Sequence, residues 1–196
     1  LGNPSVPAPR DFTDAMVDLY ENGDPVAIHG YSPSLGIPSV CATIADSLNR
    51  RFGMDYEGRH IFPTTGAAGA LSHAMRAVTK PGDEIITFAP YFPEYQPYVN
   101  GTGAHLTVIP ADTASFQINF EAFEAALNPN VQAVLINTPN NPSGAVYSAE
   151  TLTRLASILE AKQREYGHDI FLISDEPYRE IVFDGNTQPY PARFYA

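Results

Sequence analysis

The sequence has little cysteine, little positive charge and no long apolar run. Its 196 residues include one cysteine, Cys41, which excludes an internal disulfide framework and is typical of a reducing compartment, so we expect a cytoplasmic protein. Asp and Glu outnumber Lys and Arg by 22 to 11, and the formal charge of −11 argues against nucleic acid as the partner. No apolar segment reaches the roughly 18 residues of a membrane span, and no secretory signal is recognisable. We therefore expect no membrane association.

What the sequence does contain is an alternation of short β-rich runs and helical patterns. Amphipathic helices are expected between the runs and near the amino terminus, where Gly23 and Gly53 would each end one. Ser148 is the expected N-cap of the last helix and Gly167 its stop. Strands that alternate with helices form a parallel sheet buried on both faces, so we predict an α/β fold. The runs predict strands at residues 60–64, 84–88, 105–109, 131–136 and 170–174.

In such a sheet, ligands bind beyond the carboxyl ends of the strands, and three segments follow expected strands. The first is TTGAAGA, at residues 64–70. It leads into a helix whose first N–H groups have no partner within the helix, an arrangement that favours a phosphate group. The alternative is a tight turn in which the glycines only relieve crowding. The pattern is neither G-x-G-x-x-G nor a P-loop, so a dinucleotide or nucleoside triphosphate is less favoured.

The second segment is NTPNNPSG, at residues 137–144. Its two prolines stiffen the loop, and Asn140 and Asn141 can each donate and accept hydrogen bonds through a short side chain. The same composition is typical of a plain turn, which on composition alone is the better interpretation.

The third segment, SDEPYRE at residues 174–180, places Asp175 at the end of an apolar strand. Its carboxylate would hold a positive group there, with the Tyr178 phenol three residues on. The alternative is that Asp175 is only a helix N-cap, with Pro177 in the first turn. Taken together, a phosphate cradle, an amide and an Asp–Tyr pair suit pyridoxal 5'-phosphate (PLP). A carboxylate beside the ring nitrogen keeps that ring protonated, which makes it an electron sink.

Four segments resemble the class I/II aminotransferases, the fold-type I PLP enzymes related to aspartate aminotransferase. TTGAAGAL, APYFPEY, NTPNNPSG and SDEPYREI occur in the family's order. The resemblance implies a three-layer α/β/α large domain with a mainly parallel sheet, incomplete here, at residues 54–196. An N-terminal arm and helices would occupy residues 1–53. It also implies PLP-dependent transamination between an amino acid and a 2-oxo acid, in a homodimer.

The resemblance implies that four residues contact the phosphate group and the face of the pyridine ring of the cofactor. Ala67 and Ala68 match the positions whose backbone amides bind the phosphate, and Gly66 begins that turn. Phe92 matches the aromatic residue that stacks on the pyridine ring. Its alternative role is that of a core phenylalanine.

The remaining assignments concern the other cofactor atoms and the substrate. Asn141 and Tyr178 match the two ligands of the phenolic oxygen, and Asp175 matches the partner of the ring nitrogen. Tyr31 resembles the tyrosine that reaches the phosphate of the neighbouring subunit. Gly2 resembles a glycine near the substrate carboxylate.

The lysine that such an enzyme needs has no counterpart in the sequence. That lysine holds the cofactor as a Schiff base and then moves a proton. Only Lys80 and Lys162 are present, in TKPGDE and EAKQRE, and both are interpreted as solvated charges. We therefore expect no catalytic residue in this chain, which would be a fragment that lacks the C-terminal domain and is inactive alone. Its partner would be a complementary C-terminal fragment.

Three other functions remain open at this point. A carbon–sulfur lyase or a cyclopropane-forming synthase would use the same fold and cofactor, because fold and cofactor do not fix the reaction. A nucleotide-binding α/β module without catalysis would explain the missing lysine. The five histidines are scattered without the spacing of a zinc site, so no metal centre is predicted.

Overall fold

The computed structural model describes residues 5–195, which divide into two units. The N-terminal unit comprises residues 5–47 and 56–62, and the second unit comprises residues 48–55 and 63–195. In the described part of the chain, no helix has the length and apolar character needed to cross a membrane.

The N-terminal unit is helical. It contains α1 (Arg10–Asn22), α2 (Pro25–His29), the first ten residues of α3 (Pro38–Phe52) and a 3₁₀ turn (Gly58–His60). The sequence predicts the ends of α1 and α3 correctly, because α1 stops before Gly23 and α3 stops before Gly53. Cys41 and Ala45 of α3 are buried, whereas α1 has no buried residue.

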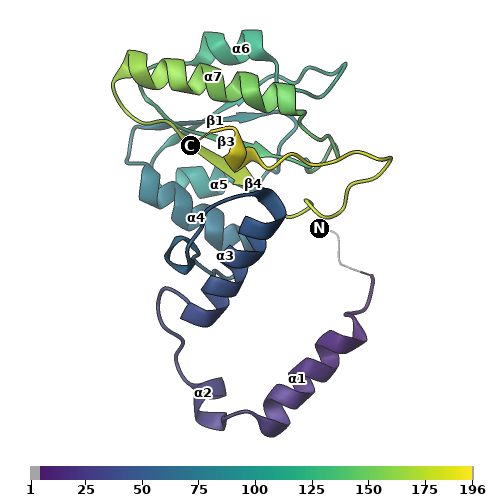
Figure 1. Ribbon diagram of the computed structural model, residues 1–196. Helices are drawn as coiled ribbons and strands as arrows, with labels where there is room; N and C mark the ends of the chain where they lie inside the picture. Colours follow the sequence, from purple (N-terminus) through teal and green to yellow (C-terminus); the bar gives the residue numbers. More distant parts are fainter. Residues whose placement is uncertain (1–4, 196) are drawn as a thin grey trace. The chain divides into compact units, whose positions relative to one another are not determined.

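The second unit contains a sheet of four parallel strands (Figure 1). The spatial order is β2-β1-β3-β4, so β1 and β3 are central and β4 lies at an edge. The predicted parallel α/β sheet is therefore confirmed, with two strands matching their predicted bounds. The strands are β1 (Glu84–Phe88), β2 (His105–Ile109), β3 (Val131–Asn137) and β4 (Phe171–Asp175).

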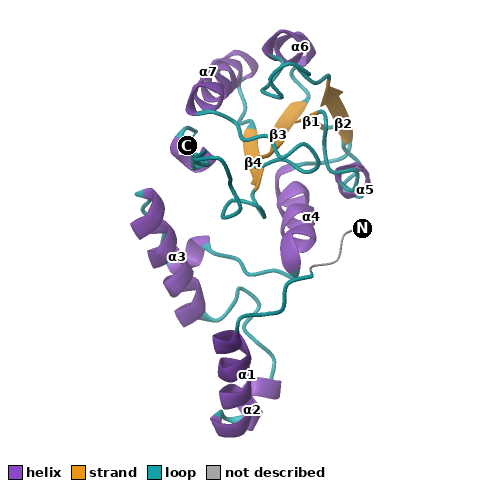
Figure 2. Ribbon diagram, turned by 90° about the vertical axis from the view of Figure 1, so that its right-hand side faces the viewer, coloured by secondary structure: helices purple, strands orange, loops and turns teal. Residues whose placement is uncertain are grey.

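Helices cover both faces of this sheet and make three layers, with α4 and α5 on one face and α6 and α7 on the other (Figure 2). Successive strand residues point to opposite faces. Ile85 accordingly packs in the core on the α4 and α5 side, and Ile86 in the core on the α6 and α7 side. The helices are α4 (Gly66–Val78), α5 (Tyr95–Asn100), α6 (Phe120–Ala126) and α7 (Ala149–Tyr166).

The caps of α7 follow the sequence prediction. The Ser148 hydroxyl accepts a hydrogen bond from the Thr151 amide, and Gly167 ends the helix in the left-handed conformation at φ 75°. Capping at both ends fixes where α7 starts and stops. It thereby sets the lengths of the connections to β3 and β4.

The strand predicted at residues 60–64 is wrong. The His60 N–H donates to the Glu57 carbonyl at 2.9 Å and the Glu57 N–H donates to His60 Nδ1 at 3.0 Å, which closes a 3₁₀ turn ending at His60. Residues 61–64 are irregular. A strand forms only where a neighbouring strand pairs its backbone groups, and Pro63 has no amide to donate. The apolar pattern of these residues was not sufficient without such a partner among the described residues.

We expect Leu155→Ala in α7 to lower the free energy of unfolding by about 2–5 kcal/mol, because it opens a cavity in a closed core. Leu155 is fully buried against the sheet. Ser157→Ala, on the exposed side of the same helix, should change stability by less than about 0.5 kcal/mol. Urea unfolding followed by circular dichroism measures both, and equal losses would contradict the assigned core.

Candidate functional site

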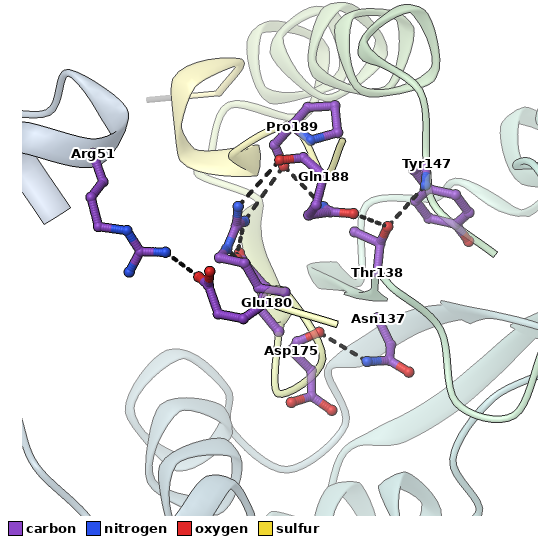
Figure 3. Close-up of polar contacts among 10 residues, drawn as sticks. Arg51, Asn137, Thr138, Tyr147, Asp175, Glu180, Gln188 and Pro189 are labelled. Atoms are coloured by element: carbon purple, nitrogen blue, oxygen red, sulfur yellow. Dashed lines mark hydrogen bonds and ion pairs between the residues drawn. The ribbon is translucent and has the colours of Figure 1, made fainter. Parts of the chain in front are cut away.

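The carboxyl ends of β3 and β4 are joined by the side chain of Asn137. In the sheet register, Asn137 lies opposite Asp175. The Asn137 amide nitrogen donates to the Asp175 backbone carbonyl at 2.9 Å, as Figure 3 shows. Its amide oxygen accepts from the Asn141 backbone N–H at 2.6 Å. Asn137 is 4% exposed, and a buried amide with both ends bonded fixes the loop after β3 relative to the end of β4.

The Asp175 side chain is held by a tyrosine from the helical layer. The Tyr95 hydroxyl of α5 donates to Asp175 Oδ2 at 2.6 Å, and the Tyr95 side chain is fully buried. Burial raises the pKa of the Asp175 carboxyl above its usual value, and the hydrogen bond from Tyr95 opposes that rise. Burial, followed by the contact with Asp175, raises the pKa of the Tyr95 phenol far above its ordinary range. This pair is therefore a neutral phenol donating to a carboxylate that burial makes easier to protonate.

Two predicted aromatic residues lie beside this pair. The Phe92 ring meets the Tyr95 ring edge-on, with centroids 5.8 Å apart and planes at 78°. Phe92 is half-buried and packs against the core on the α4 and α5 side. Tyr178 is close enough to add a smaller electrostatic contribution to the raised pKa of Tyr95.

A cavity of about 380 Å³ opens between the loop after β3 and the segment after β4. Asn141 and Tyr178 both line it, so the structure brings an amide and a phenol from two strand ends to one space. Tyr178 is 39% exposed. The lining also includes the apolar residues Val146, Ile181, Val182 and Phe183.

The predicted phosphate-binding turn is the first turn of α4. Gly66 has φ 71°, a left-handed conformation that favours glycine, and Gly66, Ala67 and Ala68 are exposed. The N-cap residue, Thr65, makes no side-chain cap hydrogen bond. The Gly66 N–H donates to the Thr64 carbonyl at 2.9 Å. The next amides, at Ala67 and Ala68, open a helix of 13 residues without a side-chain cap from Thr65, an arrangement that suits an anion.

Two further predicted residues do not belong to the described part of the second unit. Tyr31 belongs to the N-terminal unit, where its side chain is fully exposed, and Gly2 lies outside the described residues. The alternative role of Asp175 as a helix N-cap is wrong, because Asp175 ends β4 and residues 177–180 form a turn and not a helix.

Sequence reasoning missed Tyr95 and Asn137. Tyr95 is 80 positions from Asp175 in the chain, and nothing in the pattern PYFPEY distinguishes it from the tyrosines around it. Asn137 did carry a signal, since it ends the apolar run VQAVLIN, where a polar side chain is buried. A buried polar residue needs a partner, and here the partners are the two strand-end segments.

Neither lysine lies at the carboxyl ends of the strands. Lys80 follows α4 and precedes β1, and Lys162 is in the last part of α7, before β4. Both lysines therefore lie toward the amino ends of the strands, away from the candidate site. The Lys162 ammonium is bonded to Glu165 at 2.8 Å, which raises its pKa and keeps it charged.

Comparison with known proteins identifies a matching family. The family model described as aminotransferase class I and II matches residues 2–195. The chain is 32% identical over 186 residues to a probable N-succinyldiaminopimelate aminotransferase of Mycobacterium tuberculosis. It is 33% identical over 193 residues to an aspartate aminotransferase of Rhizobium meliloti. These alignments cover 93% and 98% of the chain but 44% and 45% of the relatives, so the chain spans about half their length.

Solved structures agree with this result. An aminotransferase from Eubacterium rectale matches with a TM-score of 0.97 and 47% identity, covering 100% of this chain and 49% of that one. The aspartate aminotransferase of Thermus thermophilus with maleate matches with a TM-score of 0.87 and 29% identity. That alignment covers 99% of this chain and 48% of the Thermus chain.

We expect Tyr95→Phe to raise the pKa of Asp175, because the variant removes a hydrogen bond that favours the carboxylate. A hydrogen bond to a charged group contributes about 1.5–3 kcal/mol, and the variant should lose stability on that scale at neutral pH. Carbon-13 NMR of the Asp175 carboxyl and urea unfolding measure the two effects. Tyr98→Phe is the matched control, because Tyr98 donates to exposed Glu94 from the same helix. Its loss should not move the Asp175 titration by as much.

We expect Asp175→Asn to change how stability depends on pH. The pKa of Asp175 is higher in the folded than in the unfolded chain, so the folded state binds the proton more tightly. The wild-type protein therefore gains stability as the pH falls through the pKa of the folded state. The asparagine cannot titrate. The stability of the variant relative to wild type should therefore be greatest at neutral pH and decrease on acidification. A variant that becomes more stable relative to wild type on acidification would contradict the raised pKa.

Proposed function

The chain belongs to the class I and II aminotransferase family, and from this premise we propose that the protein catalyses PLP-dependent transamination between an amino acid and a 2-oxo acid. Its fold is that of the fold-type I aminotransferases. Relatives of this family are PLP-dependent. The proposal concerns the whole protein, since this chain corresponds to about half the length of its relatives.

The observation that carries the proposal is the half-buried Asp175 carboxylate at the end of β4. Tyr95 engages one of its two oxygens, which leaves the other for an N–H donor of a ligand. A carboxylate in this position would keep a proton on a ring nitrogen. The hydrogen bond from Tyr95 orients the carboxylate and favours its charged form, although burial works against that form.

The other residues also fit PLP. The first amides of α4, at Ala67 and Ala68, would bind its phosphate, and the ring of Phe92 would stack on the pyridine. Asn141 and Tyr178, which share one cavity, would hydrogen-bond the phenolic oxygen. When bound, PLP supplies an electron-poor ring that stabilises negative charge on the α-carbon of the amino acid.

The lysine that moves the proton would come from polypeptide outside these 196 residues, because Lys80 and Lys162 lie toward the amino ends of the strands and the candidate site lies at their carboxyl ends. Residues 54–196 would then be an incomplete cofactor-binding domain, after an arm and helices at residues 1–53. We further propose a homodimer in which Tyr31 reaches the phosphate of the neighbouring subunit. Gly2 would lie near the substrate carboxylate.

The substrates are proposed only as a class. Relatives are named for aspartate and for N-succinyldiaminopimelate, so similarity alone does not choose between them. A cytoplasmic location is proposed from the single cysteine. The nucleotide-binding alternative is not favoured, because the family match covers residues 2–195.

Reductive trapping tests the proposed function on the purified protein. The protein is incubated with PLP and reduced with borohydride, and the labelled lysine is mapped by peptide mass spectrometry. We expect the pyridoxyl group on a lysine outside the present sequence, since a specific lysine must lie beyond the carboxyl ends of the strands. Labelling restricted to Lys80 or Lys162, or no labelling at all, would refute the proposal.

A further inference from the structure

The turn after β4 contains an ion pair that is largely withdrawn from water. Arg179 Nε donates to Glu176 Oε2 at 2.6 Å, and Arg179 Nη2 contacts the same oxygen. The side chains are 11% and 18% exposed. Burying two charges is costly unless their remaining hydrogen-bonding groups are also satisfied. The partners of the guanidinium therefore indicate what this pair holds in place.

Those partners come from two distant segments. Arg179 Nη1 donates to the Gln188 carbonyl at 3.3 Å, and Nη2 lies 3.5 Å from the Pro189 carbonyl. The guanidinium also lies 4.8 Å from the ring centroids of both Phe52 and Tyr190. These two rings are themselves stacked 4.4 Å apart at 9°. Arg179 thus fastens the turn to residues 188–190 and to the end of α3.

The connection continues to the loop after β3. The Thr138 hydroxyl donates to the Gln188 side-chain oxygen at 3.0 Å and accepts from the Tyr147 amide at 2.9 Å, as Figure 3 shows. Thr138 is fully buried and directly follows Asn137. The turn that carries Tyr178 and the loop that carries Asn141 are consequently tied to one polar network.

The backbone of the turn makes one long and one short hydrogen bond of its own. The Arg179 N–H reaches the Glu176 carbonyl only at 3.3 Å, beyond the ordinary range of such bonds, although the Ile181 N–H bonds the Tyr178 carbonyl at 2.9 Å. Tyr178 is 39% exposed, so part of its ring lies outside the packed interior. The Glu176–Arg179 pair reaches beyond the turn to residues 188 and 189, so it adds a constraint that the backbone bonds within the turn do not supply.

We propose that the Glu176–Arg179 pair is a positioning device for Tyr178, which keeps the phenol at the cavity that it shares with Asn141. This inference rests on the proposed function, because it assumes that Tyr178 binds the cofactor. Arg179 is not among the residues that line the cavity, and its hydrogen bonds go to Glu176, Gln188 and Pro189, so in this proposal it acts through the turn.

A double-mutant cycle on the affinity for PLP tests the device. PLP is removed from the purified holoprotein and titrated back into wild type, Tyr178→Phe, Arg179→Met and the double variant, with its absorbance as the readout. Loss of one hydrogen bond to a charged oxygen weakens binding by about tenfold. We expect about that loss in each single variant. The double variant should bind within about twofold of Tyr178→Phe, because two changes that act through one contact are not additive.

Two controls separate positioning from stability. Arg51→Met removes an exposed ion pair with Glu180 of the same turn, and such surface pairs contribute little, so PLP affinity should stay within about twofold. Arg179→Lys keeps the charge but loses the planar fork, and it should fall between wild type and Arg179→Met. If Arg179→Met does not fold, Glu176→Gln replaces it in the cycle.

The outcomes discriminate between the two proposals. Wild-type protein that fails to bind PLP would refute the proposed function and this inference with it. Binding by the wild type, with effects of Tyr178→Phe and Arg179→Met that multiply in the double variant, would refute the positioning role alone.

Discussion

A single buried amide, the side chain of Asn137, sets the geometry on which the candidate site depends. It donates to the backbone of Asp175 at the end of β4 and accepts from the backbone of Asn141 in the loop after β3. Each bond gives a partner to a backbone polar group at the point where the hydrogen bonds of the sheet end. If either bond were missing, this amide would no longer link the two segments that carry the functional side chains.

Two opposing influences set the pKa of the Asp175 carboxyl. Burial favours the protonated acid, and the Tyr95 hydroxyl favours the carboxylate. A carboxylate in open water would be charged but weakly oriented, and one buried without a donor would be neutral. Asp175 lies between these two cases, because it is half-buried and has one donor, Tyr95. It does so at a strand end where a ligand can reach it.

Local signals predicted much of this architecture. The apolar runs at 84–88 and 105–109 matched the observed strands, and Ser148 and Gly167 marked the ends of α7, because these features depend on neighbouring residues. The strand expected at 60–64 failed for the opposite reason, since pairing depends on a distant partner. The same limit applies to the site. Asp175 stands out at the end of its strand, whereas its donor Tyr95 is defined only by a contact across 80 positions.

The bond from Asn137 to Asp175 also has a consequence for how such a protein changes over time. It ends on the backbone carbonyl of Asp175, an atom that every amino acid possesses. The alignment of the two strand ends is therefore insensitive to which side chain occupies position 175. A substitution there alters the chemical character of the position while the surrounding scaffold keeps its shape. Scaffold and reactivity can in this way diverge independently.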